Sequence, residues 1–131
     1  MLHHVTLDVA DLERSSRFYD ALLGPLGWRR IFSDPDALGY GFFDDLLLVL
    51  AVGRRPAPGT GHFCVAATGT PAVKAAFEAG VGAGGRSEGR PSQRRGWEPG
   101  YYSAYLRDPD GYRVEIAVRR PARMPAHERA A

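Results

Sequence analysis

The stretch HVTLDVADLERSSRFYDALLGPLG, residues 4–27, carries the first strand and helix of a unit that the chain repeats. Apolar and polar residues alternate from residue 4 to residue 9, which predicts a half-buried strand. Asp11 stands where a helix N-cap belongs, and apolar residues follow it at near-helical spacing. Gly24, Pro25 and Gly27 then end the predicted helix.

Three further strands complete this first unit. They are predicted at residues 28–32, 38–43 and 46–52, where apolar residues gather between turn formers. Residues 53–61, GRRPAPGTG, form a Pro/Gly-rich linker. We therefore expect a βαβββ module over about residues 2–52.

The same order begins again 58 residues later, where His4 coincides with His62 and Tyr19 with Phe77. The predicted elements are a strand at 62–67, a helix capped by Thr70, and strands at 101–106 and 112–118 joined by a tight turn. The second module thus spans about residues 62–118. The pattern predicts one α+β domain over residues 1–119, whose curved mixed sheets enclose a cleft if they curve towards each other, and a loose tail at 120–131.

Length and composition exclude several classes of function. The chain has 131 residues, 44% hydrophobic and 24% charged, as expected of a single globular domain. Its net charge of +2 does not indicate nucleic-acid binding, and no apolar run is long enough to span a membrane. One cysteine excludes an intrachain disulfide and no signal peptide is recognisable, so we expect a cytoplasmic protein.

Strand alternation brings two histidines and one acid to the same side of the predicted sheets. The apolar residues of each module's first strand must face the helix, so His4 and His62 face away from it. In the last strand Val114 and Ile116 are the apolar set, which leaves Glu115 on the helix-free face. Two imidazoles and a carboxylate suit a divalent ion (Fe, Mn, Zn, Ni or Co) with positions open for substrate. Each residue taken alone also fits a solvated sheet position.

The opening stretch 4–19, the triplet Gly61-His62-Phe63 and the octapeptide DPDGYRVE at residues 108–115 resemble the vicinal oxygen chelate superfamily. Its members include glyoxalase I, bleomycin-resistance proteins, fosfomycin-resistance thiol transferases and extradiol dioxygenases. The resemblance covers residues 2–118 and implies paired βαβββ modules with a divalent metal ion. It assigns the superfamily's metal ligands to His4, His62 and Glu115. It also implies a homodimer whose subunits complete one site together.

The reaction stays open, because the sequence departs from each characterised branch. Glyoxalase I has a fourth ligand, a Glu on the last strand of its first module, where residues 46–52 hold no acid. Extradiol dioxygenases have a Tyr ten residues before the final Glu, as Tyr105 is here, but also a cavity His that this chain lacks. Residues 89–100 do not match the Lys/Ser-rich loop of the fosfomycin enzymes.

Two tyrosines are candidate proton donors beside this predicted site. Tyr102 and Tyr105 lie on the strand before the last, and alternation puts them on opposite faces. Thr6 shares the face of His4 and is a candidate substrate contact.

Three further residues are candidate substrate contacts. Arg113 shares the face of Glu115 and suits an anionic group. Arg95 and Trp97 lie in a loop expected at residues 86–99, which would act as a lid over an anionic or aromatic substrate.

Three functions fit these observations. The first is a metal-dependent lyase, isomerase or oxygenase acting on a small substrate with adjacent oxygens. The second is a bleomycin-resistance-like module that binds an aromatic or cationic molecule without chemistry, and the third is a structural dimer with a vestigial site. Metal content, and ligand binding after chelation, would separate the three.

Overall fold

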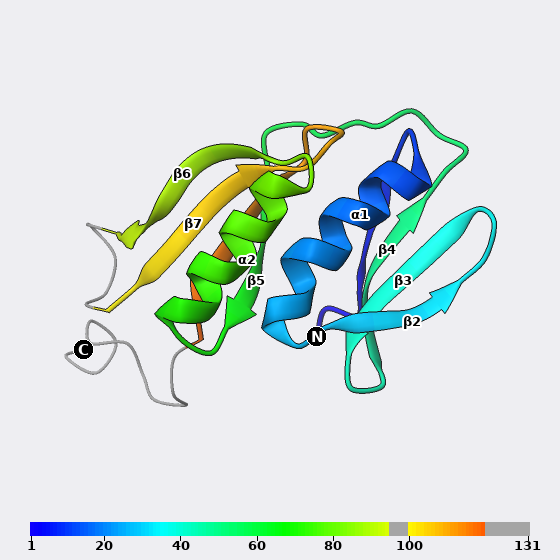
Figure 1. Cartoon of the computed structure of the whole chain (residues 1–131). Helices are drawn as coiled ribbons and strands as arrows, with labels where there is room; N and C mark the ends of the chain where they lie inside the picture. Colours follow the sequence, from blue (N-terminus) through cyan, green and yellow to red (C-terminus); the bar gives the residue numbers. More distant parts are fainter. Residues whose placement is uncertain (95–99, 120–131) are drawn as a thin grey trace.

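The chain folds into two modules with the same order of elements, each contributing one four-stranded sheet (Figure 1). The computed structural model describes residues 1–94 and 100–119. Module one contains β1 (Val5–Asp8), α1 (Leu12–Leu23), the 3₁₀ turn η1 (Gly24–Leu26), β2 (Arg29–Ser33), β3 (Ala37–Phe42) and β4 (Asp45–Ala51). Module two contains β5 (His62–Ala67), α2 (Thr70–Gly82), β6 (Arg86–Gln93), β7 (Tyr102–Arg107) and β8 (Arg113–Val118). This is the predicted α+β fold of paired βαβββ modules.

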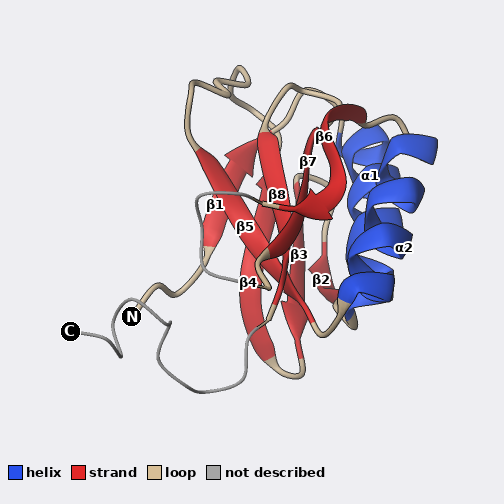
Figure 2. Cartoon of the chain, turned by 90° about the vertical axis from the view of Figure 1, so that its left-hand side faces the viewer, coloured by secondary structure: helices blue, strands red, loops and turns tan. Residues whose placement is uncertain are grey.

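The two sheets share one topology. Their strand orders are β1-β4-β3-β2 and β5-β8-β7-β6, and in each the first strand runs parallel to the last while the other pairs are antiparallel. Both helices lie on the same side of the sheets and pack against each other (Figure 2). The opposite, helix-free faces of both sheets are therefore available for a site.

Strand β6 occupies most of the segment predicted as a lid loop. Residues 86–93 pair antiparallel with β7, with register shifts around Gly89. The prediction of a loop is therefore wrong for this part, while residues 95–99 lie outside the described residues. The sequence RSEGRPSQ lacks the alternating apolar residues that predict a strand. An edge strand such as β6 does not need them, and it tolerates Gly and Pro.

The two helices begin differently. Asp11 caps α1 as predicted, and its side chain accepts a hydrogen bond from the Arg14 amide at 3.0 Å. Helix α2 begins after Gly69, which is extended and provides no side-chain cap, and Pro71 lies in its first turn. The prediction that Thr70 is the N-cap is wrong, because Thr70 is already helical.

One apolar core joins the modules through their helices. Phe18 of α1 is fully buried, and a Cβ on Gly85 would meet its ring at 2.5 Å. A Cβ on Gly80 would meet Leu106 at 2.9 Å and Leu22 at 3.2 Å. Glycine at these two positions lets α1 and β7 approach the end of α2 closely, so the two modules share one interior.

The turn before β8 fastens module two to module one. Asp110 accepts hydrogen bonds from Arg14 Nη2 at 2.8 Å and the Ser15 hydroxyl at 3.2 Å, at the start of α1. The Tyr19 hydroxyl donates to buried Asp108 at 2.6 Å. Burial first, and then the Asp108 charge, raise the pKa of Tyr19, so the phenol keeps its proton as the donor. The motif DPDG therefore holds the two modules together.

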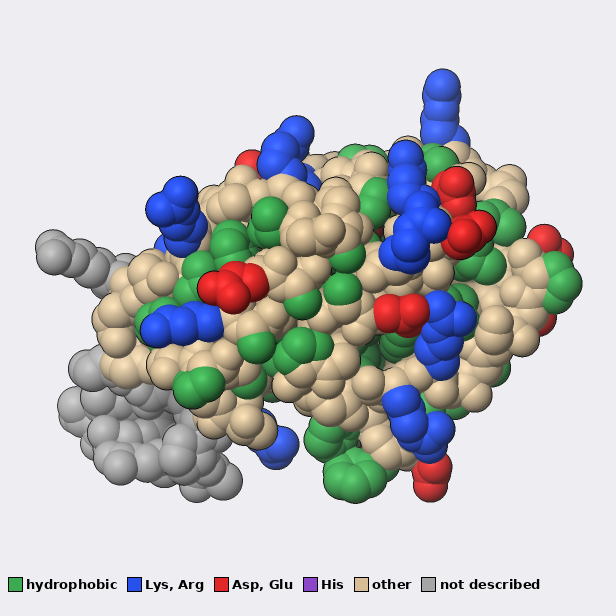
Figure 3. Space-filling view, viewed as in Figure 1, with side chains coloured by type: hydrophobic (Ala, Val, Ile, Leu, Met, Phe, Trp, Pro, Cys, Tyr) green, Lys and Arg blue, Asp and Glu red, His purple; other side chains and the backbone are tan. Residues whose placement is uncertain are grey.

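The helix-bearing surface carries no single-sign patch. Figure 3 shows basic and acidic side chains interspersed across this face. None of the helices in the described ranges 1–94 and 100–119 is long and apolar enough to cross a bilayer. The predicted loose tail, residues 120–131, lies outside the described residues.

Candidate functional site

The helix-free face of module two gathers polar groups around a buried carboxylate. Glu115 lies in β8 between Cys64 of β5 and Tyr105 of β7, and it is only 4% exposed. Its neighbours along the strand are buried against the helices, so strand alternation turns Glu115 to the other side.

His62 and Tyr101 both contact this carboxylate. His62 Nε2 lies 3.0 Å from Glu115 Oε1, and the Tyr101 hydroxyl donates to Oε2 at 2.6 Å. Burial alone would raise the pKa of Glu115, but hydrogen bonds from Tyr101, His62, Tyr105 and Ser103 outweigh it and lower the pKa. Burial and the bond to Glu115 raise the pKa of Tyr101. The site thus holds an anionic carboxylate beside a protonated phenol at neutral pH.

Tyr105 is surrounded by cations on the same face. The Arg113 guanidinium lies 4.2 Å from the centre of its ring and that of Arg94 lies 5.2 Å away. The His62 ring meets it edge-on at 5.4 Å. Burial first, and then the Glu115 charge, raise the pKa of Tyr105.

Arg94 is held by neutral acceptors. It donates to the Ser103 hydroxyl at 2.9 Å and to the carbonyls of Ser103 and Arg90 at 2.8 and 3.0 Å. Arg94 and Tyr101 are not among the predicted site residues. Strand alternation places Tyr101 on the face of Tyr105, whereas only the pairing of β6 with β7 brings Arg94 there.

Tyr102, predicted as a catalytic residue, does not join this cluster. Tyr102 packs against the apolar core on the opposite side of β7, so it cannot act beside Glu115 in this chain. The prediction that Tyr102 is a catalytic residue is therefore wrong, because strand alternation turns its side chain towards the core. Arg95 and Trp97 lie outside the described residues.

His4 lies elsewhere, just before β1. It is exposed, and its Nδ1 atom lies 2.7 Å from Nδ1 of His3. Thr6 is also exposed on β1, opposite Val49. Within residues 1–94 and 100–119, no group of three His, Cys, Asp or Glu side chains is close enough to hold one ion.

The course of β1 and β5 explains this separation. The end of β1 lies near the start of β5, because the Tyr112 hydroxyl donates to the Asp8 carbonyl at 2.7 Å and β8 begins beside His62. At the other end, His4 shares a crevice with residues 64–66. The two strands therefore run in opposite directions, and His4 and His62 lie towards opposite ends of the region where β1 and β5 meet.

Known proteins share this arrangement of modules. The family model of the glyoxalase-like domain matches residues 4–117. The chain belongs to the glyoxalase-like domain family. It is thus a member of the vicinal oxygen chelate superfamily, as the motifs predict, while no curated protein sequence matches significantly.

Solved structures of glyoxalase-like proteins superimpose on most of the chain. A glyoxalase/bleomycin resistance protein from Albidiferax ferrireducens T118 is 32% identical, with a TM-score of 0.78, over 89% of this chain and 97% of that one. A glyoxalase-related enzyme from Fulvimarina pelagi is 26% identical, with a TM-score of 0.72, over 91% and 88%. An E144Q mutant of glyoxalase I from Zea mays is 25% identical, with a TM-score of 0.68, over 88% of this chain and 45% of the maize chain.

The donor atoms of module two suit one divalent ion. Two ligand atoms that each lie about 2.1 Å from an ion, at right angles to one another, are about 3.0 Å apart. His62 Nε2 and Glu115 Oε1 have this separation. A nitrogen and a carboxylate oxygen are also the donors that Zn, Fe, Mn, Co and Ni accept. A third ligand would have to come from outside the cluster.

Proposed function

We propose that the protein is a divalent-metal-dependent enzyme acting on a small substrate that chelates the ion through adjacent oxygens. The reaction would be of the lyase, isomerase or oxygenase type. The observation that carries the proposal is the 3.0 Å approach of His62 Nε2 to Glu115 Oε1 on a helix-free sheet face. Membership of the glyoxalase-like family supports it.

The third ligand in this proposal is His4 of the partner subunit in a homodimer. His4 is exposed, and its Nδ1 atom is engaged by His3, which leaves Nε2 for an ion. A two-fold pairing that brings β1 of one subunit to β5 of its partner would form two equal sites. Each site would then contain two ligands from one chain and one from the other.

The protein's own groups have separable roles in such a site. His62 and Glu115 hold the ion, which supplies Lewis-acid stabilisation of negative charge that develops on a substrate oxygen. Tyr101 carries its proton 2.6 Å from Glu115 and can donate it to substrate. Burial and the hydrogen bond to Glu115 raise the pKa of Tyr101, so the phenol is protonated near neutral pH in the metal-free chain. Arg113 favours a substrate with negative charge on this side.

Metal uptake tests the proposal directly. Purified protein is stripped with chelator, reloaded with Co²⁺, and freed of unbound metal before its metal content is measured. We expect retained Co²⁺ in the wild type and loss of it in His62→Ala and Glu115→Gln, with Glu78→Gln on α2 as the control. Diols, 2-oxoaldehydes with thiols, and epoxides are then screened as substrates. Equal and negligible uptake by wild type and His62→Ala would end the metal proposal.

Binding without catalysis is the second candidate function. It is favoured because, within the described ranges of one chain, no third His, Cys, Asp or Glu side chain is close enough to share an ion with His62 and Glu115. It predicts that the wild type retains no Co²⁺ and that small-molecule binding to the module-two face is the same with and without chelator.

A further inference from the structure

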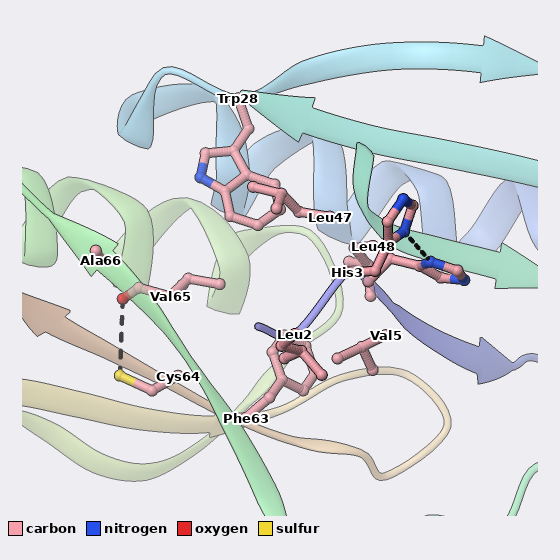
Figure 4. A pocket seen from close by; sticks show the side chains of 11 residues that line it. Leu2, His3, Val5, Trp28, Leu47, Leu48, Phe63, Cys64, Val65 and Ala66 are labelled. Carbon is pink, nitrogen blue, oxygen red and sulfur yellow. Dashed lines mark hydrogen bonds between the residues drawn. The ribbon is translucent and has the colours of Figure 1, made fainter. Parts of the chain in front are cut away.

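A second site candidate lies between the modules and is lined in part by His4 and by Cys64, the strand neighbour of Glu115. It is a crevice of about 210 Å³. Trp28 and Leu47 border it from module one, and Phe63 and Val65 border it from module two (Figure 4). The segment before β1 passes its mouth, where Leu2 is 78% exposed. Neither His62 nor Glu115 lines it.

The walls of the crevice are apolar and uncharged. Among the described residues that line it, none is Asp, Glu, Lys or Arg. A charged ligand would lose its hydration there without gaining an ionic partner, which disfavours its binding. Trp28 and Phe63 offer aromatic surfaces, which favour stacked or edge-to-face contact with another ring.

We propose that this crevice binds a neutral, single-ring aromatic molecule whose ring lies between Trp28 and Phe63. The size supports one ring, because a protein cavity of about 150 Å³ already admits benzene. A volume of about 210 Å³ leaves room for one or two small substituents and excludes a fused polycyclic body.

The histidine pair at the mouth supplies the polar contact. His3 Nδ1 lies 2.7 Å from His4 Nδ1, and both side chains line the crevice (Figure 4). The ring nitrogens of histidine can donate or accept hydrogen bonds. A hydroxyl group, which both donates and accepts, complements this pair, so a phenol fits better than a plain arene.

Binding of p-cresol to EDTA-treated full-length protein tests the proposal by calorimetry and ligand-observed NMR. We expect saturable binding, weaker by about tenfold or more for benzoate and benzylammonium, whose charges the walls do not offset. Val5→Phe places a ring in the crevice and should weaken p-cresol binding at least about tenfold. Trp28→Ala, which removes one wall, should weaken it as well. Circular dichroism and urea unfolding verify that each variant is folded.

Val81→Phe is the matched control, because it makes the same change at a partly exposed site on α2 outside the crevice. It should leave p-cresol affinity within about twofold of wild type. Equal binding by wild type and folded Val5→Phe, or no saturation by p-cresol, would overturn the proposal. Because the protein is metal-free, none of these outcomes bears on Co²⁺ uptake.

Discussion

Module one and module two share a backbone plan but differ on their helix-free faces. In module two, Glu115 of β8 is paired with Tyr105 of the neighbouring strand β7. At the equivalent position in module one, Val49 of β4 is paired with Gly39 of the neighbouring strand β3. A Cβ on Gly39 would meet the Phe32 ring at 2.3 Å, so that ring fills the space beside Gly39. Module two therefore presents a carboxyl group and a phenol at this position, whereas module one presents the apolar side chains of Val49 and Phe32.

This difference indicates that the two modules contribute different groups to a site. Module one has no carboxylate at the position equivalent to Glu115, where Val49 stands, so it cannot hold an ion in the same way. What it retains is His4, the counterpart of His62 at the start of the first strand. A site that uses both histidines must therefore combine module one with module two, and in this chain they lie towards opposite ends of the region where β1 and β5 meet. Dimerisation is the simplest way to bring them together.

The largest effect is expected at Tyr101, which lies directly before β7 and on the face opposite to that of Tyr102. Tyr101→Phe removes the proton donor next to Glu115 and should lower kcat by about 100-fold, the usual contribution of a positioned acid. Tyr102→Phe, on the core side of the same strand, should change kcat less than about twofold. Steady-state kinetics on a substrate found in the screen measures both. Equal losses in the two variants would contradict the assignment of faces.

An intermediate effect is expected where the modules are joined. Tyr19 and Phe77 hold equivalent helix positions, and only Tyr19 has a hydroxyl, which donates to buried Asp108. Tyr19→Phe leaves that acceptor without one partner and should lower the free energy of unfolding by about 1–3 kcal/mol. Urea unfolding measures it, with Tyr102→Phe as the control. A midpoint unchanged from wild type would show that the turn contributes little to joining the modules.

The smallest effect is the contribution of Asp20, in module one, to the pH dependence of the free energy of unfolding. Burial alone would raise the pKa of Asp20, but hydrogen bonds from Arg30 and Tyr40 outweigh it, so the pKa lies below 3.8. A lowered native pKa stabilises the fold above the unfolded-state pKa, and that stability is lost as the pH falls through the native value. Urea midpoints between about pH 5 and pH 2 should therefore fall more steeply for wild type than for Asp20→Asn.

Glu78 provides the matched control for this pH dependence. It is the counterpart of Asp20 on α2, and its side chain makes no ion pair within the described residues. Glu78→Gln should leave the acid slope as in wild type. A slope that Asp20→Asn does not change would contradict the role of the Arg30 and Tyr40 contacts.

Local pattern predicted most of the fold and half of the site. Alternation within β5 and β8 was enough to bring His62 and Glu115 to one face, because a buried face fixes strand parity. It failed for β6, whose polar sequence is ordered by its pairing with β7. It also could not predict where His4 lies relative to His62. The distance between His4 and His62 depends on how α1, α2 and the DPDG turn pack the modules together. Such contacts between distant segments produce no periodic pattern in the sequence.

The central claim is that one ion is held by His62 and Glu115 of one subunit and His4 of the partner subunit. Complementation tests it: His4→Ala and Glu115→Ala chains carry different tags, are refolded together, and mixed dimers are isolated by both tags. If ligands cross the interface, each parent dimer retains almost no Co²⁺ while the mixed dimer regains one intact site, about one Co²⁺ per dimer against about two in wild type. If the three ligands belong to one chain, the mixed dimer has no intact site, and a metal content as low as that of the parents would contradict the claim.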